Sequence, residues 1–150
     1  MNLKVPPPLQ ALICIGLIWL IARTLPEFSF SFPGQTIAAV FVAAIGVAID
    51  VISLNFFMRA KTTVSPISPE KTTSLVTDGV YKYTRNPMYL GLTFILSGFA
   101  IWQGNLFGFV GVILFVGYVT RFQIIPEETI LREKFGQEYE DYCSRTGRWL

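Results

Sequence analysis

The stretch MYLGLTFILSGFAIWQGNLFGFVGVILFVGYVTRFQII, residues 88–125, decides the fold. It contains two apolar runs, residues 88–102 and 106–125, that are separated only by the tripeptide QGN. Because so short a connection keeps neighbouring segments side by side, the pair predicts a tight helical hairpin. The first run reaches only about 22 Å at the α-helical rise, so it either enters a bilayer without crossing it or extends through its polar neighbours.

Two further apolar runs, residues 9–22 and 35–57, precede this stretch. The prolines at positions 6–8 interrupt the start of the first run and no A-x-A site follows Leu20, so we interpret it as a retained membrane helix and not a signal peptide. The chain is 52% hydrophobic and 15% charged, whereas soluble domains are about a quarter charged. The predicted fold class is an all-α integral membrane protein with four apolar helices.

Residues 127–145 are predicted to form a C-terminal amphipathic helix after Pro126 ends the fourth apolar run. Glu127 and Glu128 fall in its first turn, where acidic side chains interact favourably with the helix dipole. Gly136 weakens this helix by roughly 1 kcal/mol. The apolar residues recur at helical spacing on one face, which we expect to lie on the membrane surface or under the bundle: Ile130, Leu131, Phe135, Tyr139, Tyr142 and Cys143.

A polar connector, residues 59–87, joins the second and third apolar runs, and long loops in small proteins are often functional. Asp78-Gly79 lies between β-prone runs and predicts a tight hairpin turn. The connector and the tail from Arg121 hold most of the basic residues, whereas the connection between the first two runs has only Arg23 at its edge. The positive-inside rule then places the N-terminus and both polar segments in the cytoplasm.

Composition excludes several functional classes. A net charge of +2 is too small to indicate nucleic-acid binding. The chain has no histidine, which removes His-dependent triads, HExxH zinc sites and His-ligated haem, and Cys14 and Cys143 form no CxxC. We therefore predict no metal and no nucleic-acid partner. Asp50, inside the second apolar run, must either face a polar cavity or partner, or lie near the headgroups.

Two polar clusters lie at membrane boundaries on the same predicted face. Residues 81–91, YKYTRNPMYLG, open the third apolar run, and Glu127-Glu128 follow the fourth. The hairpin brings its two ends together, so we expect the clusters to meet. Arg85 can bind a carboxylate bidentately and the glutamates can accept hydrogen bonds, which suits a zwitterionic cofactor or an amphiphilic ligand. Alternatively, an Arg–Glu pair pins the hairpin, Tyr89 belongs to the interfacial belt and the glutamates cap a helix.

The run GVYKYTRNPMYLG at residues 79–91, followed by Glu127-Glu128, resembles the signature of isoprenylcysteine carboxyl methyltransferases and the related phospholipid methyltransferases. The connector and the C-terminus extend this resemblance through Thr62, Thr63, Val64, Pro66, Pro69, Glu70, Leu75, Val76, Pro126, Leu131, Arg132, Glu133, Lys134, Phe135, Gly136, Glu138, Tyr139, Tyr142, Gly147, Arg148, Trp149 and Leu150. It covers residues 55–150. It implies a membrane-embedded methyltransferase that uses S-adenosylmethionine, in a bacterial inner membrane.

The resemblance also implies where the cofactor binds. It implies a pocket that opens to the cytoplasm, and a lipophilic small-molecule or prenylated substrate that arrives laterally through the membrane lipids. The implied cofactor-binding residues are Tyr83, Arg85, Asn86, Pro87, Tyr89, Leu90, Gly91, Glu127 and Glu128, and the implied catalytic residues are Arg85, Asn86, Tyr89 and Glu128. The family commonly has histidine at the position of Asn86, whose amide can bind a cofactor but cannot act as a general base near neutral pH.

On this interpretation residues 1–150 form a single membrane-embedded domain. Residues 1–58 are an N-terminal helical pair and residues 59–150 the cofactor-binding catalytic part. Two alternatives stay open, an NADPH-dependent membrane reductase and a non-catalytic membrane protein. The methyl acceptor is also open among a prenylcysteine, a phospholipid amine, a thiol and an isoprenoid acid.

Overall fold

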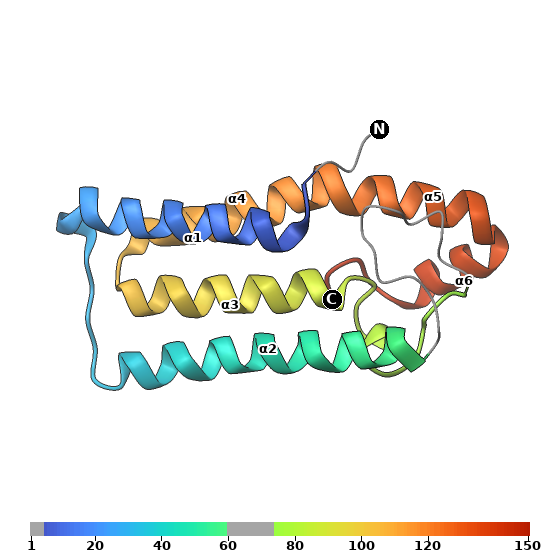
Figure 1. Ribbon diagram of the computed structural model, residues 1–150, viewed down its shortest axis with the longest axis horizontal. Coiled ribbons are helices and arrows are strands. Elements are labelled where there is room, and N and C mark those ends of the chain that lie inside the picture. The colour runs from blue at the N-terminus through green and yellow to red at the C-terminus, as the bar shows by residue number, and fades with distance from the viewer. Residues whose placement is uncertain (1–4, 60–73) are drawn as a thin grey trace.

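The computed structural model describes residues 5–59 and 74–150, which fold almost entirely into helices (Figure 1). The longer elements are α1 (Pro7–Thr24), α2 (Gln35–Arg59), α3 (Pro87–Gln103), α4 (Phe109–Val119), α5 (Ile125–Phe135) and α6 (Gln137–Arg145). Shorter segments are η1 (Pro26–Phe28), η3 (Gly79–Lys82), η4 (Leu106–Gly108) and η5 (Thr120–Ile124). Within the described ranges, the extended structure amounts to one isolated bridge between Ser29 and Asn105. The predicted all-helical class is confirmed.

Three stretches of the described chain are long and apolar enough to cross a membrane: Pro7–Thr24, Gln35–Arg59 and Leu106–Phe135. Their outward surfaces carry large apolar side chains; for example, Ile13 is 63% exposed and Ile37 is 76% exposed. A surface this apolar is unfavourable in water but suits lipid hydrocarbon. The chain is therefore an integral membrane protein.

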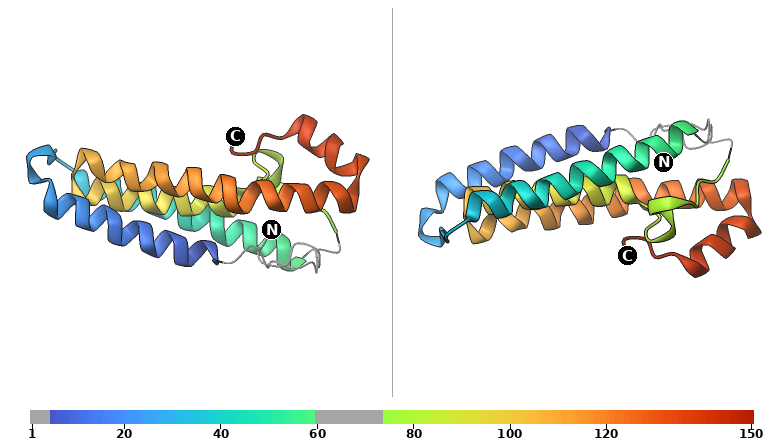
Figure 2. Two further views of the ribbon diagram at one scale, coloured as in Figure 1. Left: turned by 90° about the horizontal axis from the view of Figure 1, so that it is seen from above. Right: turned by 90° about the horizontal axis from the view of Figure 1, so that it is seen from below.

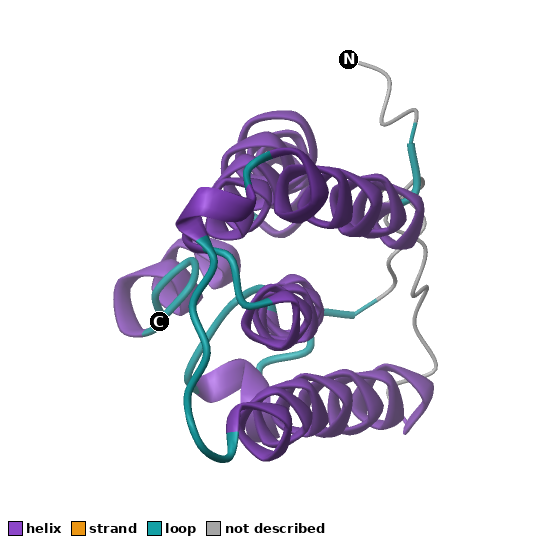
Figure 3. Cartoon of the chain, turned by 90° about the vertical axis from the view of Figure 1, so that its left-hand side faces the viewer, coloured by secondary structure: helices purple, strands orange, loops and turns teal. Residues whose placement is uncertain are grey.

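The shorter helix α3, of 17 residues, lies at the centre of the bundle. Figures 1 and 3 show α2 along one side of it and α1 with α4 along the other. Fully buried side chains form the core between α1, α3 and α4, among them Ile18, Leu96 and Phe115. Figure 2 shows α5 continuing beyond the bundle and α6 turning back toward the start of α3. This return places the C-terminal segment beside the polar motif that precedes α3.

The contact between α2 and α3 is made by backbone as much as by side chains. A Cβ atom built on Gly46 would lie 2.5 Å from the carbonyl oxygen of Gly91, and one built on Gly98 would lie 2.7 Å from that of Ala39. Glycine and alanine at such positions let two helices approach closely, which gives dispersion contacts where no hydrophobic effect drives association. The small residues of α2, among them Ala39, Ala43 and Gly46, therefore permit this close packing against α3.

The variant Gly98→Ala tests this contact. The added methyl group must push α2 away from α3, so we expect a destabilisation of about 1–3 kcal/mol, although alanine has the higher helix propensity. The control is Gly117→Ala on α4, where a Cβ atom meets nothing within 4 Å. There the higher helix propensity of alanine should leave the stability unchanged or raise it. Thermal unfolding in detergent measures both. Equal melting temperatures for the two variants would contradict the close contact.

The helix of the fourth apolar run continues through Pro126, so the prediction that Pro126 ends it is wrong. The segment η5 just before it is a π-helical turn in which the Ile125 N–H bonds to the Thr120 carbonyl oxygen. A wider turn of this kind accommodates a residue that lacks an N–H and whose ring would otherwise collide with the preceding turn. As a result, Glu127 and Glu128 lie on a direct extension of α4.

The single amphipathic helix predicted for residues 127–145 is also wrong, because the chain breaks at Gly136. Gly136 has φ +51°, a left-handed conformation that glycine adopts without strain. The break separates α5 from α6, and an exposed ion pair between Arg132 and Glu140 bridges it. Tyr139 and Tyr142 on the predicted apolar face are buried in the new arrangement.

The β-turn predicted at Asp78-Gly79 does not form, since the described residues after it enter the short helix η3. Tertiary packing outweighs the β propensity there: the buried Tyr81 ring packs on Phe57 of α2 with ring centroids 5.4 Å apart. Gly79 has φ +63°, and a Cβ atom there would collide with the Phe56 ring. The motif positions Thr62, Thr63, Val64, Pro66, Pro69 and Glu70 lie outside the described residues.

Candidate functional site

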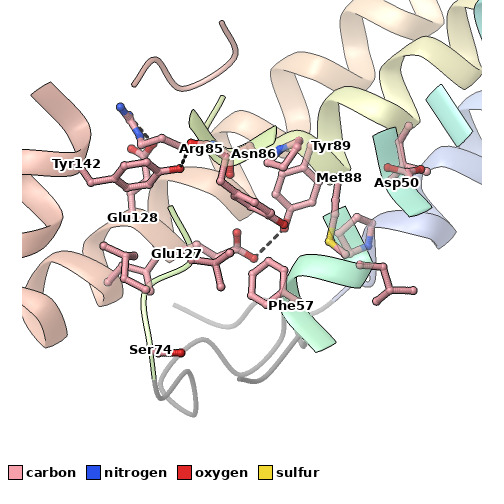
Figure 4. Close-up of a pocket in the computed structure, with 18 of the residues that line it drawn as sticks. Asp50, Phe57, Ser74, Arg85, Asn86, Met88, Tyr89, Glu127, Glu128 and Tyr142 are labelled. Carbon is pink, nitrogen blue, oxygen red and sulfur yellow. Dashed lines mark hydrogen bonds and ion pairs between the residues drawn. The ribbon is translucent and has the colours of Figure 1, made fainter. Parts of the chain in front are cut away.

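A cavity of about 560 Å³ lies where the ends of α2 and α3 meet α5 and α6. Figure 4 shows the labelled side chains around it. One group of lining residues is polar and comes from the segment before α3 and from α3, α5 and α6: Arg85, Asn86, Tyr89, Glu127, Glu128, Tyr139 and Tyr142. We call this the polar end. The apolar end is lined by Pro6, Pro7, Pro8, Val51, Leu54 and Leu92, with Asp50 among them.

The motif before α3 is held in place by the C-terminal segment. Pro87 occupies the first turn of α3, where its missing N–H has no cost. The Arg85 backbone N–H donates to the Gly147 carbonyl oxygen at 2.9 Å, and the Asn86 side-chain amide donates to the Arg148 carbonyl oxygen at 3.0 Å. These bonds fix the backbone from which Arg85 and Asn86 reach the cavity.

Glu128 lies between two arginines. The Arg85 Nη2 donates to its Oε1 at 2.9 Å, while Arg148 donates to Oε1 at 3.0 Å and to Oε2 at 2.7 Å. The Glu128 side chain is 8% exposed and that of Arg85 12%. Burial lowers the pKa of the Arg85 guanidinium, but the hydrogen bond and charge of Glu128 outweigh burial and raise it. The three groups therefore stay ionised and tie α5, the start of α3 and the C-terminus together.

Glu127 occupies the middle of the cavity and belongs to a separate network. Its Oε1 accepts a hydrogen bond from the Tyr89 hydroxyl at 2.8 Å and another from the Gln123 side-chain amide at 2.9 Å. Tyr89 and Gln123 are both buried. The network orients the Glu127 carboxylate toward the space between the polar and apolar ends (Figure 4).

Two tyrosines of α6 close the polar end. The Tyr142 hydroxyl donates to the Tyr81 carbonyl oxygen at 2.7 Å, which docks α6 on η3. Tyr139 is almost fully buried and faces the guanidinium of Arg132 at 5.8 Å. Burial raises the pKa of Tyr139 and of Tyr142, so both act as neutral phenols.

The structure brings the two predicted clusters together. Six of the residues proposed from sequence line the cavity: Arg85, Asn86, Pro87, Tyr89, Glu127 and Glu128. Three others do not line it: Tyr83 is 75% exposed, Leu90 lies outside the lining, and Gly91 faces α2, where a Cβ atom would collide with the Asp50 carboxylate. Tyr83 points outward because η3 turns the chain between buried Tyr81 and Thr84.

Sequence reasoning did not assign roles to several residues of this site. Arg148 belonged to the recognised C-terminal pattern, but its bond to Glu128 depends on the path of the last residues. Gln123 carried a usable signal, since an amide inside an apolar run is costly without a partner. The prolines at positions 6–8 predicted only the start of a helix. Their position at the cavity follows from tertiary packing, which no local pattern indicates.

The fold and the site together define a small helical membrane protein in which a cavity joins a charged end to an apolar end. The sequence profile of the phospholipid methyltransferase family matches residues 35–138. The chain therefore belongs to the phospholipid methyltransferase family, which confirms the resemblance found in the sequence.

Individual relatives agree with this membership. An uncharacterized protein of Haemophilus influenzae is 46% identical over 63 residues, which are 42% of this chain and all of that protein. The protein-S-isoprenylcysteine O-methyltransferase of Schizosaccharomyces pombe is 39% identical over 45% of this chain. Protein-S-isoprenylcysteine O-methyltransferase B of Arabidopsis thaliana is 37% identical over 58% of this chain. The matched regions span only 29% and 44% of these two enzymes.

The substitution Glu128→Gln tests the arginine–carboxylate network. It removes the charge that compensates two arginines, one of them largely buried, and we expect a destabilisation of about 3 kcal/mol, or a melting temperature about 6 °C lower. The control Glu140→Gln removes the exposed ion pair with Arg132 and should change the melting temperature little. If the two variants melt together, Glu128 does not organise the site.

Proposed function

We propose that the protein is a membrane-embedded S-adenosylmethionine-dependent methyltransferase that acts on a lipophilic acceptor. The observation that carries this proposal is a cavity in which Arg85, Asn86 and the two glutamates share one space with an apolar end lined by residues of α1, α2 and α3. A polar cofactor binds in a polar environment and an apolar acceptor in an apolar one, and the two must be adjacent for the methyl group to be transferred. The relatives named above supply one acceptor class, an isoprenylcysteine carboxylate.

The residues present fit the cofactor. A cavity of about 560 Å³ is within the usual size of about 300–1,000 Å³ for small-molecule sites. The Arg85 Nε is buried without a hydrogen-bond partner, and a buried donor of this kind is satisfied by a ligand carboxylate or hydroxyl. Glu127 uses Oε1 for both of its bonds, which leaves Oε2 to accept from the ligand's amine or ribose.

The four residues implied in catalysis then have different roles. Arg85 and Asn86 bind the cofactor, and Tyr89 orients Glu127 through its hydroxyl. Glu128 already accepts from Arg85 and Arg148, so we assign it a positioning role, in which it holds the Arg85 fork toward the cavity. None of these groups must act as a general base when the acceptor is a carboxylate.

The reaction makes modest demands on the protein. The sulfonium of the bound cofactor supplies an activated methyl group. The side chains of the polar end fix the donor, while the apolar end fixes the acceptor. Holding the donor and the acceptor in line can lower the activation free energy by several kcal/mol, and by about 7–11 kcal/mol at best. The apolar lining excludes water and so strengthens an anionic nucleophile.

We further propose that all four apolar segments cross the membrane and that the cavity faces the cytoplasm of a bacterial inner membrane. At about 1.5 Å per residue the 17 residues of α3 reach about 26 Å, and the Asn86 end extends this into the interface. Arg59, Lys82 and Arg85 lie at the cavity end of the bundle, whereas Arg23 ends α1 at the opposite side. This asymmetry follows the positive-inside rule.

Calorimetry on the detergent-solubilised protein tests the proposed function. S-adenosylhomocysteine should bind and NADPH should not. Binding of NADPH alone would support the reductase alternative, and binding of neither ligand would support a non-catalytic protein.

The variant Glu127→Gln tests the location of the cofactor. It keeps the shape and the bonds from Tyr89 and Gln123 but removes the charge that faces the ligand amine, so we expect S-adenosylhomocysteine to bind about tenfold more weakly, a loss of about 1.4 kcal/mol. Glu133→Gln on the exposed face of α5 removes the same charge elsewhere and should leave binding unchanged. An unchanged dissociation constant in Glu127→Gln would place the cofactor elsewhere.

A further inference from the structure

The C-terminal segment, residues 146–150, is attached at two points to the helix that runs from α4 through η5 into α5. The Trp149 indole N–H donates to the Thr120 hydroxyl at 3.2 Å, and its ring packs against the core of the bundle. The neighbouring Arg148 donates two hydrogen bonds to Glu128, at 3.0 and 2.7 Å. These two attachment points are eight residues apart, which is about 12 Å along a helix.

The backbone of the same segment holds the motif that precedes α3. The Arg148 carbonyl oxygen accepts hydrogen bonds from the Asn86 side-chain amide at 3.0 Å and from the Thr84 hydroxyl at 3.3 Å. The Gly147 carbonyl oxygen accepts from the Arg85 backbone N–H at 2.9 Å. The C-terminal segment therefore connects the motif on one wall of the cavity to the helix that carries the paired glutamates on the other.

The bond between Trp149 and Thr120 can form in only one sense. The Thr120 hydroxyl donates its single proton to the Val116 carbonyl oxygen at 2.6 Å, so toward the indole it is an acceptor, and an indole N–H is a donor only. Thr120 is the first residue of the π-helical turn η5, which also carries Gln123, the partner of Glu127. Turns of this kind are frequent at functional sites. Trp149 itself does not line the cavity, so any effect it has on a bound ligand must act through other residues.

We propose that Trp149 is a positioning residue for cofactor binding, which sets the separation of the two polar walls by anchoring the C-terminal segment at Thr120. This inference rests on the proposed function and concerns the same site. Without the anchor, the segment keeps the bonds of Arg148 to Glu128 but can rotate about them, and Asn86 moves with it. The motif must then be ordered again when the cofactor binds, and this ordering cost lowers the affinity.

The test removes the anchoring bond from either side. Calorimetry on the nanodisc-embedded protein measures the dissociation constant of S-adenosylhomocysteine for Trp149→Phe, which keeps an aromatic ring in the core and removes the N–H donor. We expect binding about fivefold weaker, the equivalent of about one neutral hydrogen bond. Thr120→Val removes the acceptor at similar volume and should weaken binding by the same factor. The double variant should bind like either single variant, because both changes remove one bond, and Thr120→Ser should bind like the natural protein.

Hydrogen–deuterium exchange of the ligand-free protein gives a second readout. In Trp149→Phe the peptide that contains the Arg85 N–H, which is bonded to Gly147, should exchange faster than in the natural protein, and S-adenosylhomocysteine should slow it again. The control is Trp102→Phe, which removes an indole that is 57% exposed at the opposite end of α3. It should change neither the exchange of that peptide nor the dissociation constant.

Three results would overturn the positioning role: an unchanged dissociation constant in Trp149→Phe, effects of Trp149→Phe and Thr120→Val that add in the double variant, or unchanged exchange of the peptide with Arg85. A lower melting temperature together with natural affinity would assign Trp149 to fold stability alone and would overturn it as well. Failure of the natural protein to bind S-adenosylhomocysteine would instead remove the proposed function, whereas the exchange of the ligand-free protein would still show whether Trp149 holds the motif.

Discussion

The carboxylate of Glu128, held between Arg85 and Arg148, is the interaction on which the site depends. Each partner comes from a different part of the chain: the segment before α3, helix α5 and the C-terminal residues. A buried ion pair gains little net stability over apolar packing, but it is strongly unfavourable to separate. The network therefore contributes mainly to the specificity of the fold, because its charges are all paired only when these three segments are arranged in this way.

A second constraint sets the position of that network relative to the membrane. Backbone contact between α2 and α3 fixes the depth of Asp50 and Gly91, and the π-turn before Pro126 lets α4 run on into α5. The helix thus carries its paired glutamates beyond the bundle without a break. Gly136 then reverses the chain, and α6 closes the cavity through Tyr142. In this way, the apolar helices and the polar segments beyond them line the same cavity.

Much of this architecture could be predicted from the sequence. Long apolar runs require helices in a bilayer because every backbone polar group must be satisfied within the segment. The meeting of Arg85 with Glu128 followed from the short QGN connection, which brings the ends of two runs together. Local sequence signals were wrong where tertiary packing determines the conformation. Pro126 predicted the end of a helix, but the π-helical turn before it lets the helix continue. Asp78-Gly79 predicted a β-turn, but the packing of Tyr81 favours a short helix. Arg148 reaches Glu128, and the N-terminal prolines reach the cavity, through tertiary contacts that no local pattern records.

The central claim is that one cavity, between the arginine motif and the paired glutamates, holds the methyl donor. Photo-crosslinking with an azido-adenine derivative of S-adenosylhomocysteine, followed by peptide mass spectrometry, tests it directly. The account predicts adducts on peptides that contain residues 81–92 or 123–142, and competition by unmodified S-adenosylhomocysteine. Adducts confined to the lipid-facing surfaces of α1 or α4, or adducts that the competitor does not reduce, would contradict it.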